Sequence, residues 1–472
     1  MAALAPAASA TPAQRRARAR RAAAGALTCA AAAGIGVLAG RSPSEALAAV
    51  AVLAFVPIVL LRFTVGVGLF TVSTFIGLSG TAQKGIGAVV VLVALGRLLA
   101  QPGATPNFLS CNRRLTALVA AYLAWCVLGL IWATSTGDVL YSLERYAPNF
   151  LVFLIVFAAA RDRRDVRLLA VFFVLGSAVA VTDAIVHPQS AGGVSRLAGQ
   201  FGDPNYLAAV LVTGFSLSLA LATARTLPGL ARLAAAAAAA LCMLGILLSV
   251  SRGGLVALAV SLLVAVSIAG RWRGRLAFAG AVVVVVGAAY FLAFAPASAR
   301  QRLTSTAGGG SGRTTIWRVG WREVRANPIL GVGAGNFSTA GARYVLRPGL
   351  IDHTASGYTA YFLDTPTVAH NTYLEVLAEE GVPGALVFLS IIALSLRCAW
   401  LAASKLRERG DEELELISYG VICGTVGFLA ASFFLSEEYS KQLYLLLAMG
   451  PALLGVARRA PSGARPPAAA QA

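Results

Sequence analysis

Long apolar segments separated by short polar turns make up most of this chain. Between about residues 22 and 295, and again after residue 380, runs of roughly 16 to 22 apolar residues follow one another without the two-residue alternation of a half-buried strand. Runs of this length cross a bilayer as helices, and lipid admits only helices or closed barrels because it offers no partner to backbone polar groups. The pattern predicts an all-α protein, a polytopic transmembrane helical bundle.

About 12–14 spans are expected. The two segments after Glu45 are short, so twelve spans is the alternative to fourteen. In chain order the expected spans lie at about residues 22–40, 46–61, 63–80, 85–100, 115–134, 147–160, 168–186, 206–224, 230–249, 253–269, 276–295, 382–400, 414–434 and 440–457.

One long polar interruption, residues 296–380, organises the rest of the chain. It separates the transmembrane segment 22–295 from a second transmembrane segment at 381–457, and holds eight of the 39 Lys and Arg and two of the three His. A basic tail, 1–21, precedes the first span, and a second tail, 458–472, follows the last. The first tail has the charge pattern of a secretory signal, but no processing site follows it, so we expect an uncleaved first span.

Composition and charge add the orientation. Only 12% of the 472 residues are charged, against roughly 25% in soluble domains. A net charge of +19 could indicate a nucleic-acid partner. However, 25 of the Lys and Arg fall on the same side of the membrane as the N-terminus, and only six fall in the short connections on the other side. This asymmetry follows the positive-inside rule. We therefore expect cytoplasmic termini, a periplasmic or extracellular loop, the lipid bilayer as partner and no nucleic acid.

The predicted outer face carries most of the polar motifs, and chemistry there has neither ATP nor nucleotide sugars. A substrate must arrive already activated. The six Cys are scattered without metal-ligand spacing, so no zinc site or disulfide framework is expected, and no metal or cofactor is predicted.

Two helices are expected within the loop. After the flexible connector 308–312, residues 313–326 read as an amphipathic helix with Trp317, Trp321 and Val324 on one side, a pattern typical of a helix at the lipid headgroups. Its arginines are more often a solvated face, and these are Arg318, Arg322 and Arg325. A second helix should begin near His370 or Asn371 and stop at Gly381.

His370 is the strongest candidate for chemistry. At the first turn of a helix the positive end of the dipole favours neutral imidazole, which accepts a proton from a hydroxyl as a general base does. Glu375 could orient this region, although it lies on another face of the helix. The alternative is a loop histidine bonded to backbone. His187 and His353 have no motif around them and are interpreted as structural.

Two arginines are candidates for binding an anion. Arg252 lies between two apolar runs, where an arginine usually faces a polar cavity or an anion, and Gly253 and Gly254 would permit close backbone approach. Arg313 opens the Trp-containing helix, and a guanidinium recognises phosphate oxygens with two parallel hydrogen bonds. The alternative for either residue is an arginine that reaches the lipid headgroups.

Two further motifs have a structural and a functional interpretation. The sequence Asp203-Pro204-Asn205 is an ordinary turn and helix cap, or else a polar contact at the rim of a cavity. The glycine-rich stretch 331–335 superficially matches a dinucleotide loop, but no βαβ unit surrounds it.

Together these motifs resemble the O-antigen ligase and O-antigen polymerase family of bacterial membrane glycosyltransferases, over roughly residues 201–450. The resemblance rests on 202–205 before a span, 251–254 between spans, 312–333 early in the loop, and 370–384 at its end. The two or three extra N-terminal spans relative to the family's usual dozen are a departure.

The resemblance implies transfer of a glycan from an undecaprenyl-diphosphate carrier to an acceptor hydroxyl on the outer side of the bacterial cytoplasmic membrane, without metal or nucleotide. His370 would be the base, and Arg252 and Arg313 would bind the diphosphate. Substrate-binding roles are expected for Asp203, Asn205, Trp317, Asn371 and Glu375.

The resemblance leaves four acceptors: lipid A core in a ligase, another lipid-linked repeat in a polymerase, protein, or a cell-wall polymer. A transporter or flippase for the same lipid-linked glycan is the alternative from another class, and it would show Gly/Pro-broken helices in two related halves.

Overall fold

The computed structural model describes residues 32–37, 39–76, 80–100, 113–191, 194–268, 270–294, 297, 313–345, 352–354, 357–359 and 367–459. The predicted tail 1–21, the start of the first span, the connector 308–312 and most of the tail 458–472 lie outside these residues.

Helices form nearly all of the described regular structure, together with two short antiparallel hairpins, β1–β2 and β3–β4. The long elements are α2 (Pro43–Leu61), α3 (Phe63–Ser73), α4 (Gly80–Ala100), α6 (Arg113–Leu128), α7 (Thr136–Ala159), α8 (Arg163–Val186), α9 (Pro204–Thr223), α10 (Gly229–Leu248), α11 (Arg252–Ile268), α12 (Arg273–Ala289), α14 (Arg313–Ala326), α15 (Phe337–Val345), α16 (Thr372–Glu408), α17 (Glu412–Ala431) and α18 (Lys441–Arg458). The short ones are η1 (Gly129–Ile131), β1 (Gln189–Ala191), β2 (Val194–Arg196), η2 (Gly199–Phe201), η3 (Gly270–Trp272), η4 (Tyr290–Phe294), β3 (Asp352–Thr354), β4 (Gly357–Thr359) and η5 (Ser432–Phe434).

The predicted helical membrane bundle is confirmed. Within the described residues nine helices are long and apolar enough to cross a membrane, and four shorter apolar helices accompany them. Helices α9 and α17 form the centre of the bundle. In each of them 78% of the 18-residue apolar stretch is buried, whereas in α4 only 22% of this stretch is buried. Apolar side chains that remain exposed on such outer helices would face lipid, which is the solvent of this bundle.

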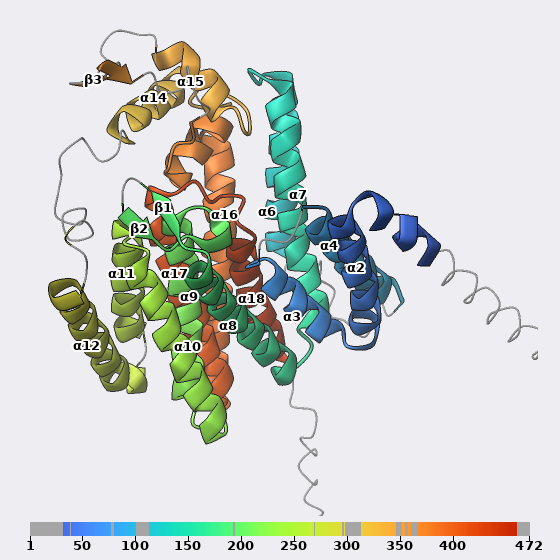
Figure 1. Cartoon of the computed structure of the whole chain (residues 1–472), viewed down its shortest axis with the longest axis vertical. Helices are drawn as coiled ribbons and strands as arrows, with labels where there is room; N and C mark the ends of the chain where they lie inside the picture. The colour runs from blue at the N-terminus through green and yellow to red at the C-terminus, as the bar shows by residue number, and fades with distance from the viewer. Residues whose placement is uncertain are drawn as a thin grey trace, which may run out of the picture.

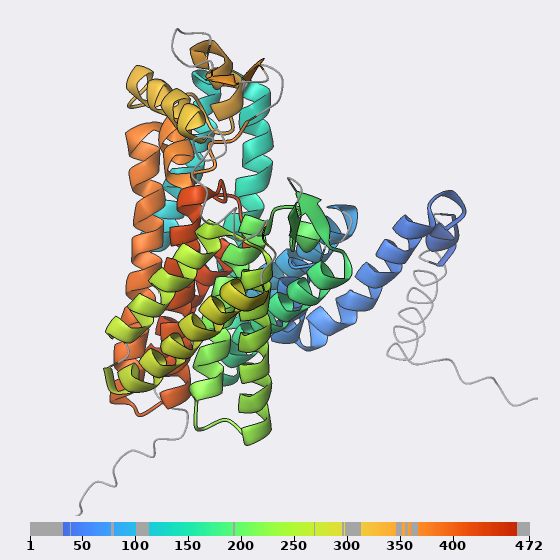
Figure 2. The same cartoon turned by 60° about the vertical axis from the view of Figure 1, so that its left-hand side comes forward.

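The bundle has two ends, built from different elements (Figure 1). At one end lie α14, α15 and the starts of α7 and α16, and at the other end lie the α9–α10 and α16–α17 connections (Figures 1 and 2). The second end is rich in arginine. There Glu413 pairs with Arg163, 2.8 Å away, and Glu415 pairs with Arg271 and Arg407 at 2.7 and 2.9 Å. We call this the basic end and the other the loop end.

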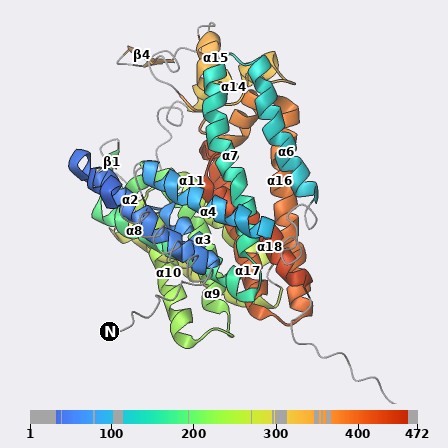
Figure 3. The same ribbon diagram turned by 90° about the vertical axis from the view of Figure 1, so that its right-hand side faces the viewer.

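Helices α2, α3 and α4 form a layer beside the central bundle (Figure 3). Within it α2 packs against α3 and α4, and the layer meets the bundle where α3 contacts α8 and α4 contacts α7. The two segments whose shortness left the span count open are therefore the separate helices α2 and α3.

Helix α16 joins a predicted loop helix to a predicted span. It begins at Thr372, capped by Asn371, as the sequence indicated, but it continues to Glu408 through a break at Gly381, whose φ is 65° and ψ −175°. The break divides it into a first arm, 372–380, and a second arm of ~40 Å that is long enough to cross a bilayer. Helix α7 likewise starts at Thr136, before the predicted span at 147–160, because Ser135 caps it.

The glycine-rich stretch 331–335 holds this break. Val332 N–H donates to the Ala378 carbonyl at 2.9 Å and Gly333 N–H to the Glu379 carbonyl at 2.8 Å. Gly331 has a φ of 68°, and a Cβ there would lie 2.2 Å from the Glu379 carbonyl oxygen. Only glycine fits such an approach, so this stretch has a structural explanation in place of a dinucleotide loop.

Helix α14 has the predicted bounds but a different buried face. Ile316, Val319 and Val324 are buried with Phe337 of α15 and Leu374 of the first arm of α16. Trp321, expected on the same side as Val324, is 51% exposed. The prediction of that face was wrong because the helix packs on protein through its small and β-branched residues.

Glu323 is buried inside this loop packing. It is 0% exposed, and within the described residues neither carboxylate oxygen has a hydrogen-bond partner. Burial, with a smaller contribution from Glu375, raises the pKa of Glu323 to about 9. The side chain is therefore a neutral carboxylic acid at neutral pH, since ionisation without a partner would carry the full desolvation cost.

Glu323→Gln is expected to remove a pH-dependent part of the stability. The folded pKa lies above the unfolded value of 4.5, so the folded state holds a proton that the unfolded state has lost, and wild-type stability falls as pH rises from about 4.5 to 9. Thermal unfolding in detergent should give the variant a higher Tm than wild type at pH 8, by roughly 2–4 °C for each kcal/mol of unfolding free energy that the wild type loses. Near pH 4.5 the two Tm values should be equal. Glu408→Gln, at an exposed site, is the control and should track wild type. A Tm difference for Glu323→Gln that is independent of pH would contradict this account.

Candidate functional site

The segment before His370 is held by two side chains predicted to bind substrate. Trp317 Nε1 donates to the Ala369 carbonyl at 3.0 Å, and the Ala369 N–H donates to Glu375 Oε2 at 3.2 Å. Ser436 donates to the same Glu375 oxygen. Both backbone polar groups of Ala369 are thus fixed by side chains, which sets where the next residue starts. Trp317 and Glu375 position His370 in this structure.

His370 has an unusual backbone conformation. Its φ is 47°, and it shares the left-handed region with only Val250 among the non-glycine residues that the structure describes. Such conformations cost of order 1–3 kcal/mol and persist where the surroundings over-determine them. Asn371 supplies part of that constraint, because its Oδ1 accepts from the N–H groups of Tyr373 and Leu374, each at 3.1 Å, and so begins α16.

Charges from two other elements act on the His370 imidazole. Burial lowers its pKa first, the Arg313 guanidinium of α14 lowers it further, and the Asp203 carboxylate raises it. The predicted neutral imidazole is therefore supported, with burial and Arg313 as its causes. The structure brings together three residues from separate elements, of which Asp203 precedes Arg313 by 110 positions and Arg313 precedes His370 by 57.

The motif around Asp203 is both a helix cap and a link to Arg252. Asp203 Oδ1 accepts from the Asn205 N–H at 2.7 Å and so caps α9, as the sequence indicated. Asn205 Oδ1 then accepts from Ser251 Oγ at 2.8 Å. Since Ser251 directly precedes Arg252, this bond joins the start of α9 to the start of α11.

Arg196 fixes the turn in front of α11. Its Nε donates to the Ser249 carbonyl at 2.9 Å and its Nη2 to Asn205 Oδ1 at 3.3 Å, from a position only 5% exposed. The same turn contains Val250, the second non-glycine residue with a positive φ, at 48°. The two non-glycine residues with a positive φ are therefore His370 itself and a residue two positions before Arg252.

Arg252 is exposed at the first turn of α11. Gly253 next to it lies against Phe434, where an added Cβ would be 3.3 Å from the ring. Phe434 packs edge-to-face on Phe433, and Phe433 packs in the same way on Trp317 with ring centroids 5.7 Å apart. Gly254 touches α9, where a Cβ would lie 2.5 Å from Ala208, so the predicted close backbone approach is present.

An apolar groove starts at this cluster. Its volume is about 460 Å³, and it is lined from α11 by Val256 and Val260, from α16 by Tyr373, and from α17 and η5 by residues that include Phe433 and Phe434. The valines lie one and two helical turns beyond Arg252, and Tyr373 lies three residues after His370. A polar cluster at the loop end thus continues into an apolar surface along the bundle.

The sequence indicated eight site residues but missed several that build the site. Arg196 and Ser436 matched no motif, and Glu437 stood out only as part of a polar run on the predicted outer face before the last span. Burial, followed by the nearby Asp203, raises the pKa of Glu437 well above its usual value. Their roles depend on partners far away in sequence, and a local signal could not have found them.

Within the described residues no cluster of three or more His, Cys, Asp or Glu has a metal-binding arrangement. The candidate site is instead a pair of arginines, a histidine with a depressed pKa and a carboxylate at the mouth of an apolar groove.

The fold defines a multi-pass membrane protein, and a comparison with protein families suggests a glycosyltransferase-type enzyme. The family model described as O-Antigen ligase matches residues 237–389, roughly a third of the chain. The match confirms, over this segment, the resemblance to the O-antigen ligase family seen in the motifs. The matched segment contains Arg252, Arg313 and His370 but not Asp203. Comparison with curated proteins gives no match.

Proposed function

We propose that this protein transfers a glycan from an undecaprenyl-diphosphate carrier to an acceptor hydroxyl on the outer side of the bacterial cytoplasmic membrane. The observation that carries the proposal is the meeting of His370 with Arg313 and Asp203 at the loop end, where Arg252 also lies beside the apolar groove. The donor has the same two parts, a diphosphate and a long apolar chain. The groove would hold the polyprenyl chain and the arginines the diphosphate.

The proposed reaction exchanges one C–O bond for another. The acceptor hydroxyl gives its proton to the neutral His370 imidazole while its oxygen bonds to the anomeric carbon. The bond from that carbon to the diphosphate oxygen breaks, and the electron pair leaves with the diphosphate. Arg252 and Arg313 would stabilise the charge that builds there. Asp203 would stabilise the imidazolium until the proton is released to water.

Orientation is part of the proposal. The basic end carries most of the arginines in short connections, and the positive-inside rule supports a cytoplasmic basic end and a loop end outside. On that side neither nucleotide sugar nor ATP is available, and a lipid diphosphate supplies its own leaving group. Positioning and charge stabilisation can then account for most of the rate enhancement.

Deletion of the gene, followed by gel analysis of surface glycan and of carrier-linked glycan, tests the proposal. A ligase predicts the loss of attached chains while polymer accumulates on the carrier lipid. If the protein is instead a polymerase of the same family, the deletion should leave single repeats in place of chains.

Purified protein in vesicles separates both enzymes from a flippase. An enzyme forms the glycosidic product from carrier-linked glycan and acceptor on the same face. Movement of the carrier across the bilayer with no new glycosidic bond would refute the enzymatic proposal.

A further inference from the structure

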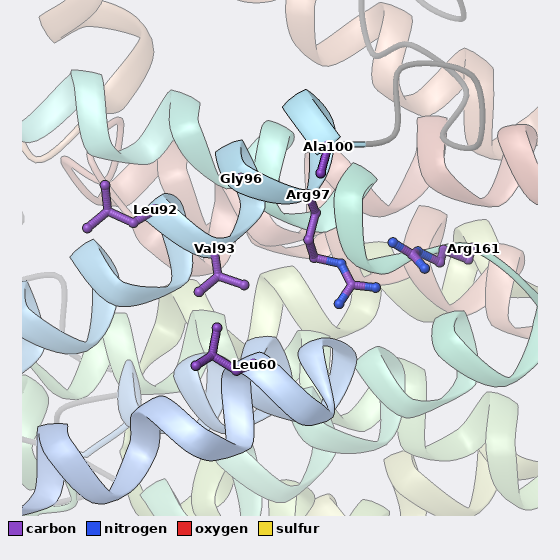
Figure 4. Close-up of a pocket in the computed structure, with 7 residues that line it drawn as sticks. All are labelled: Leu60, Leu92, Val93, Gly96, Arg97, Ala100 and Arg161. Carbon is purple, nitrogen blue, oxygen red and sulfur yellow. The ribbon is translucent and has the colours of Figure 1, made fainter. Parts of the chain in front are cut away.

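A second cavity lies at the basic end, away from the site described above. It has a volume of about 480 Å³ and lies between the last turn of α2, the second half of α4 and the residue that follows α7. Its walls include Leu60, Leu92 and Val93, together with two guanidinium groups, those of Arg97 and Arg161. Figure 4 shows the Arg97 side chain extending from α4 and the Arg161 guanidinium pointing toward it across the same space.

The two guanidinium groups lack an ion-pair partner in the part of the chain that the structure describes. Arg97 Nε is buried without a hydrogen-bond acceptor, and its guanidinium lies over the Phe63 ring, 5.1 Å from the centroid. Asp165, the nearby carboxylate, accepts from Thr64 Oγ1 at 2.7 Å and from the Arg161 N–H at 3.1 Å. Its hydrogen-bonding capacity is therefore directed to α3 and the backbone, and the cavity retains an excess of positive charge.

The remaining wall of the cavity is apolar and faces outward. Leu60 is 57% exposed and Leu92 is 68% exposed, and on a peripheral helix of a membrane bundle such side chains contact lipid. The position of Arg97 in the last turn of α4 puts the charges near the end of the span. The cavity thus has a cationic part, formed by Arg97 and Arg161, next to an apolar wall that faces the hydrocarbon of the bilayer.

We propose that this cavity is a binding site for an anionic phospholipid of the leaflet at the basic end. The phosphate would lie between Arg97 and Arg161, which offer several N–H donors in planar geometry. One acyl chain would run along Leu60, Leu92 and Val93. Basic pockets between membrane helices on the cytoplasmic side suit such headgroups. A soluble anion would use the arginines but gain nothing from the apolar wall.

Native mass spectrometry of the full-length protein in detergent tests the site. The protein is incubated with phosphatidylglycerol, with phosphatidylcholine of the same acyl chains, or with phosphatidylglycerol plus inorganic phosphate. We expect retention of phosphatidylglycerol over phosphatidylcholine, and a loss of roughly ten- to thirty-fold in affinity for phosphatidylglycerol in the double variant Arg97→Gln/Arg161→Gln. Millimolar phosphate should leave the bound lipid in place.

Arg113→Gln/Arg114→Gln is the matched control, because these exposed arginines open α6 at the same end without lining the cavity. It should retain the lipid as wild type does. Leu92→Trp fills the cavity while both charges remain, and it should reduce lipid retention as well; it decides the matter if the double arginine variant fails to fold. Wild-type binding by either cavity variant, an equal loss in the control, or displacement of the lipid by phosphate would overturn the proposal.

Discussion

His370→Ala is expected to lower the rate of glycan transfer roughly 10²- to 10⁴-fold, the usual contribution of a positioned general base. The backbone of His370 is strained, the charges of Arg313 and Asp203 act on its imidazole, and its depressed pKa keeps the ring in the form that accepts a proton. Transfer from carrier-linked glycan in vesicles measures the rate, and surface glycan on a gel reports it in cells. The variant should insert and fold as wild type does.

The pH dependence tests the same role. Because the pKa of His370 lies below 6.5, the neutral base predominates at neutral pH, and kcat/KM should stay level until the pH falls below that value. His187→Ala is the control, since that ring bonds only to Asp183 among the described residues, at 3.0 Å, and should retain activity and pH profile. Normal rates in His370→Ala would remove the residue from the mechanism.

Arg313→Gln and Arg252→Gln should each reduce transfer roughly 10²- to 10³-fold, the loss seen when one stabilising donor is removed from a developing negative charge. Arg313 acts on the His370 imidazole, so its removal also raises the pKa of that group and should move the acidic limb of the pH profile upward. The Arg252 variant should keep the wild-type profile with a lower plateau. The two arginines are thereby distinguishable in one experiment.

Arg325→Gln serves as the control, because Arg325 lies exposed on the same helix as Arg313. Arg313→Lys and Arg252→Lys keep the charge and lose the fork that binds two phosphate oxygens at once, so partial activity is expected. If the Gln variants match Arg325→Gln in rate, the arginines do not bind the diphosphate.

Local sequence determined most of the architecture. Apolar runs of membrane-crossing length specified the helices, because lipid leaves the backbone no other way to satisfy its polar groups. Asn371 and Asp203 specified the starts of α16 and α9, since a side-chain oxygen at a helix N-terminus satisfies N–H groups within three residues. Gly381 specified the break in α16, and the apolar run after it specified the second arm, which contains the predicted span at 382–400.

Tertiary structure decided how the site is assembled. The placement of Arg313 and Asp203 beside His370, the Arg196 contact with Asn205 and the strained turn at Val250 all join segments far apart in the chain. Trp321 shows the same limit, because periodicity gave the helix but only packing chose its buried face. Sequence by itself fixes which groups are available and on which elements they stand. Which of them meet depends on how whole helices pack, because a contact between distant elements leaves no pattern in either local segment.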